Sequence, residues 1–281
     1  MMKIQPDDTG TPTPEHDSMP PDVEAAVGYV RSLGIDFAKT LGLVHMYAQR
    51  CPGLVDTHLF FRVSDLLIQS GLAASFLIVE GMRNPARREL RFLLEASVKL
   101  LFTDQSMPTS PLDYRLVFFE RKVSASGLTD ELKGTKFDLL PGTWAADFVQ
   151  RVLRHYGHLS GFVHASHNQI RKHIAEQAAG LRIGFDTTET IVDAASDLFD
   201  TCEMSLVACL HAIGPSLAGD LMVAFEDMPW VFHAGRFVAA LDSNYDYKVE
   251  RQQRLVALQT SRSDWVNAGW RAHYIRPTGM Q

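Results

Sequence analysis

The chain has 281 residues, of which 46% are hydrophobic and 21% are charged. This is the balance of a globular protein with a substantial core, and it excludes disorder over most of the length. The formal net charge of −6 argues against a surface covered by nucleic acid, because phosphate binding depends on many lysines and arginines. A local basic patch is compatible with this net charge.

The N-terminal residues, the lack of a long apolar run and the cysteines together predict a cytoplasmic protein. Residues 1–21 are rich in proline, aspartate, threonine and glycine, so we expect a disordered tail rather than a secretory signal. No run approaches the ~18 apolar residues of a membrane span. Cys51, Cys202 and Cys209 form neither a CxxC pair nor a zinc spacing, which favours reduced thiols in a core.

Apolar residues recur at steps of three and four from residue 23 onwards, which is the period of amphipathic helices. We predict helices over about 23–48, 57–83, 85–102, 111–124, 143–167, 187–213 and 217–241, the last one broken at Pro229, with a weakly helical segment from Tyr245. No run alternates like a strand. The predicted fold is all-α: a single helical-bundle domain over 22–281 with about seven to nine helices.

The stretch 151–173 holds five of the eleven histidines. At about 100° per residue, a helix here places Tyr156, Ser160, His164 and His167 on one face. Arg151 and His158, with Arg154, then lie on nearly the opposite face. The stretch therefore predicts two separate sets of side chains rather than one histidine cluster.

The face with Tyr156, Ser160 and His164 has two interpretations. It is a buried polar network that fixes helix register, or it is a site in which His164 acts as a general acid or base. Pairs of histidines three residues apart also suit a metal, yet the chain has no Glu-x-x-His and no HExxH motif. We predict no metal and no cofactor.

The segment GMRNPARRELRFLLEASVKLLF, followed by YGHLSGFVHAS, resembles a family of uncharacterised bacterial all-helical proteins. The residues that carry the resemblance are Arg91, Glu95, Tyr156, Leu159, Ser160 and His164, within the region 57–167. The family is in turn distantly similar to HEPN-type helical bundles, several of which serve in phage defence. The resemblance implies a helical fold in which Arg91 and Glu95 meet Tyr156, Ser160 and His164.

Arg151 and His158 are separated by six residues, a spacing similar to the Arg-x(4–6)-His signature of HEPN domains that cleave RNA. Chance alone gives about two such matches in a chain of this composition. The spacing therefore supports only an alternative hypothesis, a metal-independent RNase. In it Arg151 stabilises the charge at the cleaved phosphate, and His158 or His164 transfers the proton.

Two charged segments complete the pattern. Glu189, Asp193, Asp197 and Asp200 form an acidic stripe, for which we expect a solvated face, or else a cation or partner site. The C-terminal segment is basic and aromatic, which suits RNA, an acidic partner or the protein's own acidic stripe. Its residues are Lys248, Arg251, Arg254, Arg262, Arg271 and Arg276, with Trp265, Trp270 and Tyr274 between them.

The sequence thus favours a cytoplasmic helical bundle that acts by binding, as a homodimer or with a protein partner, in a defence or stress system. Its expected polar centre is Arg91, Glu95, Tyr156, Ser160 and His164. The metal-independent RNase is the alternative.

Overall fold

The computed structural model describes residues 21–163, 167–180 and 187–270. Within these ranges the chain forms fourteen α-helices, one 3-10 helix, one π-helical turn and no strand. The all-α prediction is confirmed, whereas the expected number of seven to nine helices is too low. The predicted tail lies outside the described residues except for Pro21, which begins the first helix.

The helix count is higher in part because the predicted helix 57–83 is broken into pieces. It corresponds to α3 (Leu59–Arg62) and α4 (Ser64–Val79), while α2 (Leu54–Thr57) comes before them and shares only Thr57 with the predicted range. Between α2 and α3, His58 is extended, with φ −88° and ψ 127°. The carboxylate of Asp104 accepts hydrogen bonds from the N–H groups of Leu59 and Phe60, both at 2.9 Å. A side chain distant in sequence therefore fixes the start of α3, and local periodicity carries no sign of it.

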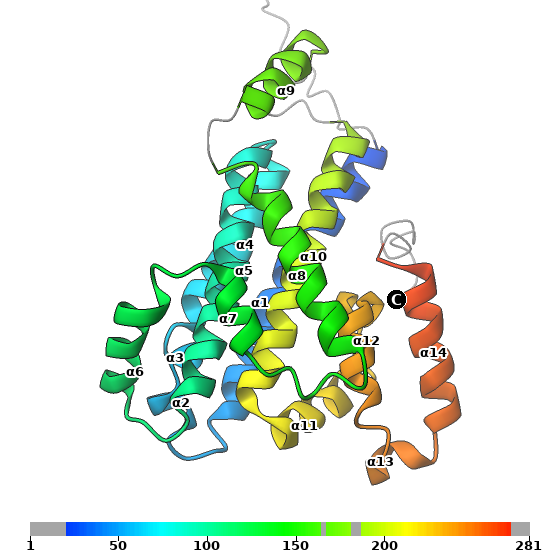
Figure 1. Ribbon diagram of the computed structural model, residues 1–281. Coiled ribbons are helices and arrows are strands. Elements are labelled where there is room, and N and C mark those ends of the chain that lie inside the picture. The colour runs from blue at the N-terminus through cyan, green and yellow to red at the C-terminus, as the bar shows by residue number, and fades with distance from the viewer. Residues whose placement is uncertain (1–20, 164–166, 181–186, 271–281) are drawn as a thin grey trace, which may run out of the picture.

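Four long helices form the centre of the bundle (Figure 1). They are α1 (Pro21–Ala48), α4, α5 (Arg83–Ser106) and α10 (Thr188–Ile213). α1 packs along α4 and α10, and α5 also packs along α4 and α10. Each helix therefore buries an apolar stripe against two neighbours, as the three- and four-residue spacing predicts.

α1 and α4 are antiparallel and approach closely through small residues. A Cβ atom added to Gly71 would lie 2.6 Å from Phe37 Cδ1, so only glycine fits there. Ser75 Oγ donates to the carbonyl of Val30 at 2.9 Å. These contacts set the relative height of the two helices.

The other helices surround this centre (Figure 1). α6 (Leu112–Phe118), a π-helical turn (Phe119–Val123) and α7 (Leu128–Gly134) lie beside α5, and α8 (Trp144–Ser160) packs on α5 and α10. α9 (His167–Ala178) extends from one end. α11 (Pro215–Phe225), a 3-10 helix (Val231–Ala234), α12 (Arg236–Ser243), α13 (Val249–Gln252) and α14 (Leu255–Ala268) complete the chain, and the predicted break at Pro229 is confirmed. None of the described helices has the length and apolar character needed to cross a membrane.

A buried carboxylate joins α10 to α12. Glu203 Oε1 accepts hydrogen bonds from the backbone N–H groups of Phe237 at 2.7 Å and Val238 at 3.3 Å. Burial raises the pKa of Glu203 from 4.5 to about 7, against the effect of these two donors. The start of α12 therefore rests on a group that titrates near neutral pH.

We expect the free energy of unfolding to fall as pH rises from 4.5 through about 7, because only the folded state still holds the proton there. Glu203→Gln should flatten this pH dependence and stabilise the protein at pH 8, on the order of 2–3 kcal/mol. Chemical denaturation at a series of pH values measures both effects. The exposed Glu120→Gln is the matched control, and equal pH profiles for the two variants would contradict the assignment.

Candidate functional site

Four of the expected centre residues meet between α5 and α8. Arg91 donates to Tyr156 Oη at 2.6 Å and to Ser160 Oγ at 3.1 Å. The Tyr156 hydroxyl donates to Glu95 Oε2 at 3.1 Å. We call Arg91, Glu95, Tyr156 and Ser160 the α5–α8 network. The fifth expected residue, His164, lies outside the described residues.

The α5–α8 network reaches the protein surface on one side and the core on the other. The side chains of Arg91 and Glu95 are 26% and 25% exposed. Lys99, which is buried, donates to Glu95 Oε1 at 2.8 Å and to the carbonyl of Ser124 at 3.1 Å. Burial and the Glu95 charge raise the pKa of Tyr156. The hydroxyl of Tyr156 therefore stays protonated and acts as the hydrogen-bond donor to Glu95.

Replacing Tyr156 with phenylalanine tests this network. We expect Tyr156→Phe to lower the free energy of unfolding by about 1–2 kcal/mol, because Arg91 and Glu95 each lose a charge-assisted hydrogen bond. Urea denaturation measures the loss. Tyr114→Phe on the exposed side of α6 removes a hydroxyl from solvent and should cost less than about 0.5 kcal/mol. Equal losses at both positions would show that the Tyr156 hydroxyl is not a structural link.

A second network joins α5 and α8 to α10. Arg87 donates to Asp197 Oδ2 and to Asp193 Oδ2, both at 2.7 Å. His158 Nε2 lies 3.1 Å from Asp197 Oδ1. We call Arg87, His158, Asp193 and Asp197 the α8–α10 network. Asp200, one turn further on, is ion-paired with Arg151.

These contacts correct the expectation of a solvated acidic stripe. Asp197 is buried, and three of the four acidic side chains, Asp193, Asp197 and Asp200, are paired with cations. The separation of two residue sets on α8 is confirmed, since Tyr156 contacts α5 while His158 contacts α10. Sequence reasoning missed Arg87. Its only signal was its place one turn before Arg91.

His158 is the half-exposed member of the α8–α10 network, with 49% of its side chain accessible. The hydrogen bond with Asp197 raises the pKa of His158 despite partial burial. Its neighbour His155 is buried, bonds Thr201 Oγ1 at 2.8 Å, and has its pKa lowered to about 4 by burial. His158 is therefore the histidine of this pair whose protonated form is favoured, whereas burial favours the neutral form of His155.

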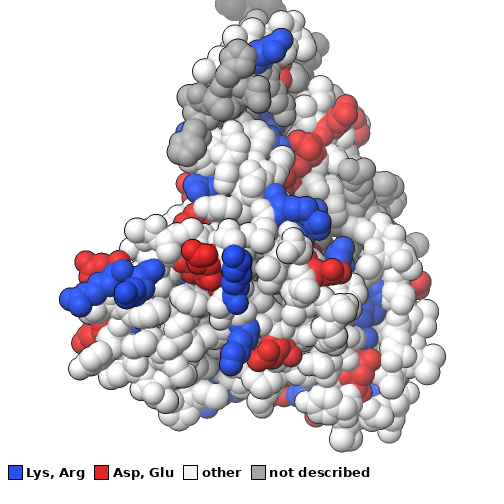
Figure 2. Space-filling view, in the orientation of Figure 1, with Lys and Arg blue, Asp and Glu red and all other residues white. Residues whose placement is uncertain are grey.

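Two arginines close to His158 face solvent without an acidic partner. Arg154 lies one turn before His158 on α8 and makes no ion pair with any described residue. Arg88 donates only to the carbonyl of Phe162, at 3.1 Å, and the Phe162 ring packs on His158. We call Arg88, Arg154 and His158 the cationic rim. Figure 2 shows basic and acidic side chains interspersed over this face rather than one broad basic field.

The C-terminal basic segment differs from expectation. Arg251 is buried and paired with Glu226 and Asp242, Arg262 bonds Asp242 at 2.8 Å, and Arg254 bonds Asp227. Lys248 pairs with Asp220. The partners lie on α11, directly after α11 and on α12, not on the acidic stripe of α10, so the expected docking onto that stripe is wrong. Arg271, Tyr274 and Arg276 lie outside the described residues.

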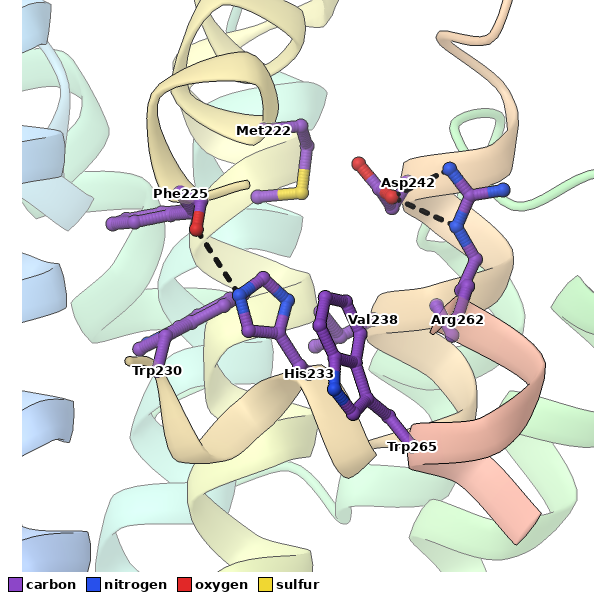
Figure 3. A pocket seen from close by; sticks show the side chains of 9 residues that line it. Met222, Phe225, Trp230, His233, Val238, Asp242, Arg262 and Trp265 are labelled. Carbon is purple, nitrogen blue, oxygen red and sulfur yellow. Dashed lines mark hydrogen bonds and ion pairs between the residues drawn. The ribbon is translucent and has the colours of Figure 1, made fainter. Parts of the chain in front are cut away.

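The tryptophans of this segment are also engaged. Trp265 stacks on His233 with ring centroids 4.2 Å apart, and Trp270 stacks on Tyr29 at 5.4 Å. Beside Trp265 is a small pocket lined by Met222, Phe225, Trp230, His233, Val238 and Arg262, among others (Figure 3). Its internal volume of about 10 Å³ holds one water molecule at most. Neither the pocket nor the paired cations suit a large ligand.

Within the described ranges, no three His, Cys, Asp or Glu side chains are grouped as a metal site requires. Comparison with protein-family models, with curated proteins and with solved structures gives no significant match.

Proposed function

We propose that this protein acts by binding, and that the cationic rim on α5 and α8 contacts the phosphate backbone of RNA. The observation that carries the proposal is the exposure of Arg88 and Arg154 without an acidic partner in a protein of net charge −6. Nine of the sixteen arginines in the described ranges form ion pairs with acidic side chains, whereas Arg88 and Arg154 form none and lie beside His158. Unpaired cations on such a protein favour an anionic ligand.

The chemistry of the rim suits a sugar–phosphate chain. Guanidinium groups bind phosphate oxygens through several N–H donors. His158, with its raised pKa, adds a third cation at mildly acidic pH. The rings of His158 and Phe162, 5.3 Å apart by their centroids, supply an aromatic surface of the kind that single-stranded bases contact. The resemblance to uncharacterised bacterial helical proteins, which are distantly similar to HEPN-type bundles of phage defence, supports a role in a defence or stress system.

Charge reversal tests the proposal with fluorescein-labelled single-stranded RNA and fluorescence anisotropy. Arg88→Glu and Arg154→Glu should each weaken binding by about tenfold, because each replaces an attraction by a repulsion. Arg121→Glu, an exposed arginine on the π-helical turn, is the matched control and should change little. Equal affinity in all three variants would reject the rim as the contact surface.

RNA cleavage is the second candidate, favoured by the contact between half-exposed His158 and Asp197. A carboxylate on one ring nitrogen orients an imidazole for proton transfer at the other, and that second nitrogen of His158 bonds no described residue. Arg151, the arginine of the sequence hypothesis, is paired with Asp200, so Arg88 and Arg154 are better placed to meet phosphate. His164 lies outside the described residues and keeps its place in the hypothesis.

Incubation of the same RNA with the protein in EDTA tests cleavage. Under this second candidate the wild type cuts the RNA, and His158→Gln or His164→Gln stops cutting without lowering the melting temperature. Bound but intact RNA would reject cleavage and leave the binding proposal standing.

A further inference from the structure

The helix α4 is more apolar in sequence than its partial burial requires. Its sequence, SDLLIQSGLAASFLIV, contains one charged residue, Asp65, in sixteen. A helix that is apolar on all sides is one that is buried on all sides. In the described structure, however, α1, α5 and α10 cover only part of it. Leu72 and Phe76 on the remaining side are 41% and 61% exposed.

α1 extends this apolar surface. Ile35 and Met46 are exposed on the outer side of α1, and Gly34, next to Ile35, lies against Leu72 and Ser75 of α4. We call the two helices' exposed surface the α1–α4 face. It consists of Ile35, Met46, Leu72 and Phe76 with the flanking charges Arg31, Lys39, Asp65 and Glu80.

The flanking charges are divided by sign between the two helices. α1 carries the basic Arg31 and Lys39, and α4 carries the acidic Asp65, with Glu80 directly after its end. None of these four exposed side chains forms an ion pair or a hydrogen bond with a described residue. Of these four charges, the basic pair therefore lies on α1 and the acidic pair on or just after α4. Burial raises the pKa of Asp36, and Lys39 lies near enough to that carboxyl to oppose the rise.

Such a face is complementary to itself under a two-fold rotation. A rotation axis parallel to the helices places α1 of one copy over α4 of the other and keeps the height of every residue. The contacts between α1 and α4 fix these heights, since Gly34 is level with Ser75, and Phe37 with Gly71. Ile35 of one copy then lies between Leu72 and Phe76 of the other.

The same rotation pairs the charges. At 1.5 Å rise per residue, Arg31 of one copy lies within about one helical turn of Glu80 of the other. Lys39 lies about four residues, or ~6 Å, along the axis from Asp65, which the length of a lysine side chain spans. Because the operation is symmetric, each contact occurs twice.

We propose that a second copy of this chain packs on the α1–α4 face, forming a two-fold homodimer whose centre is a four-helix layer of two α1 and two α4 helices. The apolar side chains exclude water at its centre, and the basic and acidic side chains fix its direction. This inference does not depend on RNA binding, because no residue of the cationic rim belongs to the α1–α4 face.

Sedimentation velocity over a range of concentrations tests the dimer. We expect the wild type to dimerise, and Leu72→Glu and Phe76→Glu each to raise the dissociation constant at least about tenfold. Val256→Glu, at a 77% exposed position of α14, is the matched control and should remain a dimer. Circular dichroism confirms that each variant is folded. A wild type that stays monomeric at about 100 μM, or a Phe76→Glu variant that dimerises as the wild type does, overturns the proposal.

Charge exchange tests the arrangement. Arg31→Glu and Glu80→Arg should each weaken the dimer several-fold, and the double variant should recover most of the loss, because the pair meets again with its signs exchanged. A double variant weaker than either single variant contradicts the proposed two-fold packing.

Discussion

Replacing Asp104 with alanine should lower the free energy of unfolding by about 3–5 kcal/mol, because the change leaves a buried arginine without its counter-charge. Arg115, which is 1% exposed, donates to Asp104 Oδ1 at 2.6 Å. The same carboxylate accepts the N–H groups of Leu59 and Phe60 at the start of α3. The substitution therefore removes three buried hydrogen bonds that hold α3, α5 and α6 together.

Urea denaturation of Asp104→Ala measures this loss. Asp113→Ala, at an exposed position in the first turn of α6, is the control and should stay within about 0.5 kcal/mol of the wild type. Asp104→Leu combined with Arg115→Met should be more stable than Asp104→Ala, since no buried charge remains. A loss below about 1 kcal/mol in Asp104→Ala would show that the pair does not organise these helices.

Replacing Arg87 with methionine should cost about 3–4 kcal/mol, because Asp197 stays buried with His158 as its only remaining partner. Methionine keeps most of the apolar volume beside Phe162, over whose ring the guanidinium carbon lies at 4.4 Å. The charge of Arg87 opposes protonation of His158. Its removal should therefore raise the pKa of His158, whereas Asp197→Asn should lower it.

Proton NMR titration of His158 checks the direction of both shifts, and thermal or urea denaturation checks the stability. Arg88→Met is the neighbouring control, because Arg88 is exposed and has no acidic partner. Its stability should change by less than about 0.5 kcal/mol. A His158 pKa that falls in Arg87→Met would contradict the α8–α10 network as described.

Local sequence signals predicted the helices well where the apolar stripe alone decides their extent. α1, α5 and α10 agree with their predicted ranges to within a few residues, and Pro229 breaks the chain as expected. The segment 57–83 has the periodicity of one helix, yet it is interrupted at His58 and Val63. The interruption at His58 is fixed by the carboxylate of Asp104, which lies 45 and 44 residues along the chain from the N–H groups of Leu59 and Phe60 that it binds.

The candidate site divides in the same way. Phasing at 3.6 residues per turn predicts the separation of Tyr156 and Ser160 from Arg151 and His158, and the expected resemblance predicts that Arg91 and Glu95 meet the first pair. Neither signal links Arg87 and His158 to Asp197, because that contact joins three helices that are far apart in sequence. The prediction that the basic C-terminal segment docks on the acidic stripe was wrong for its described residues. Arg251 and Arg262 form ion pairs with Glu226, Asp242 and Asp246, and the sequence does not show that these residues are neighbours.

The salt dependence of RNA binding tests the central claim most directly. We expect Arg88, Arg154 and protonated His158 to contact three phosphates. The logarithm of the association constant for single-stranded RNA should then fall with the logarithm of the salt concentration, with a slope of about −2. Replacing both arginines with alanine should reduce the slope to about −0.7 or less, because one phosphate contact remains. Absence of binding at low salt, or an unchanged slope in the double variant, would contradict the account.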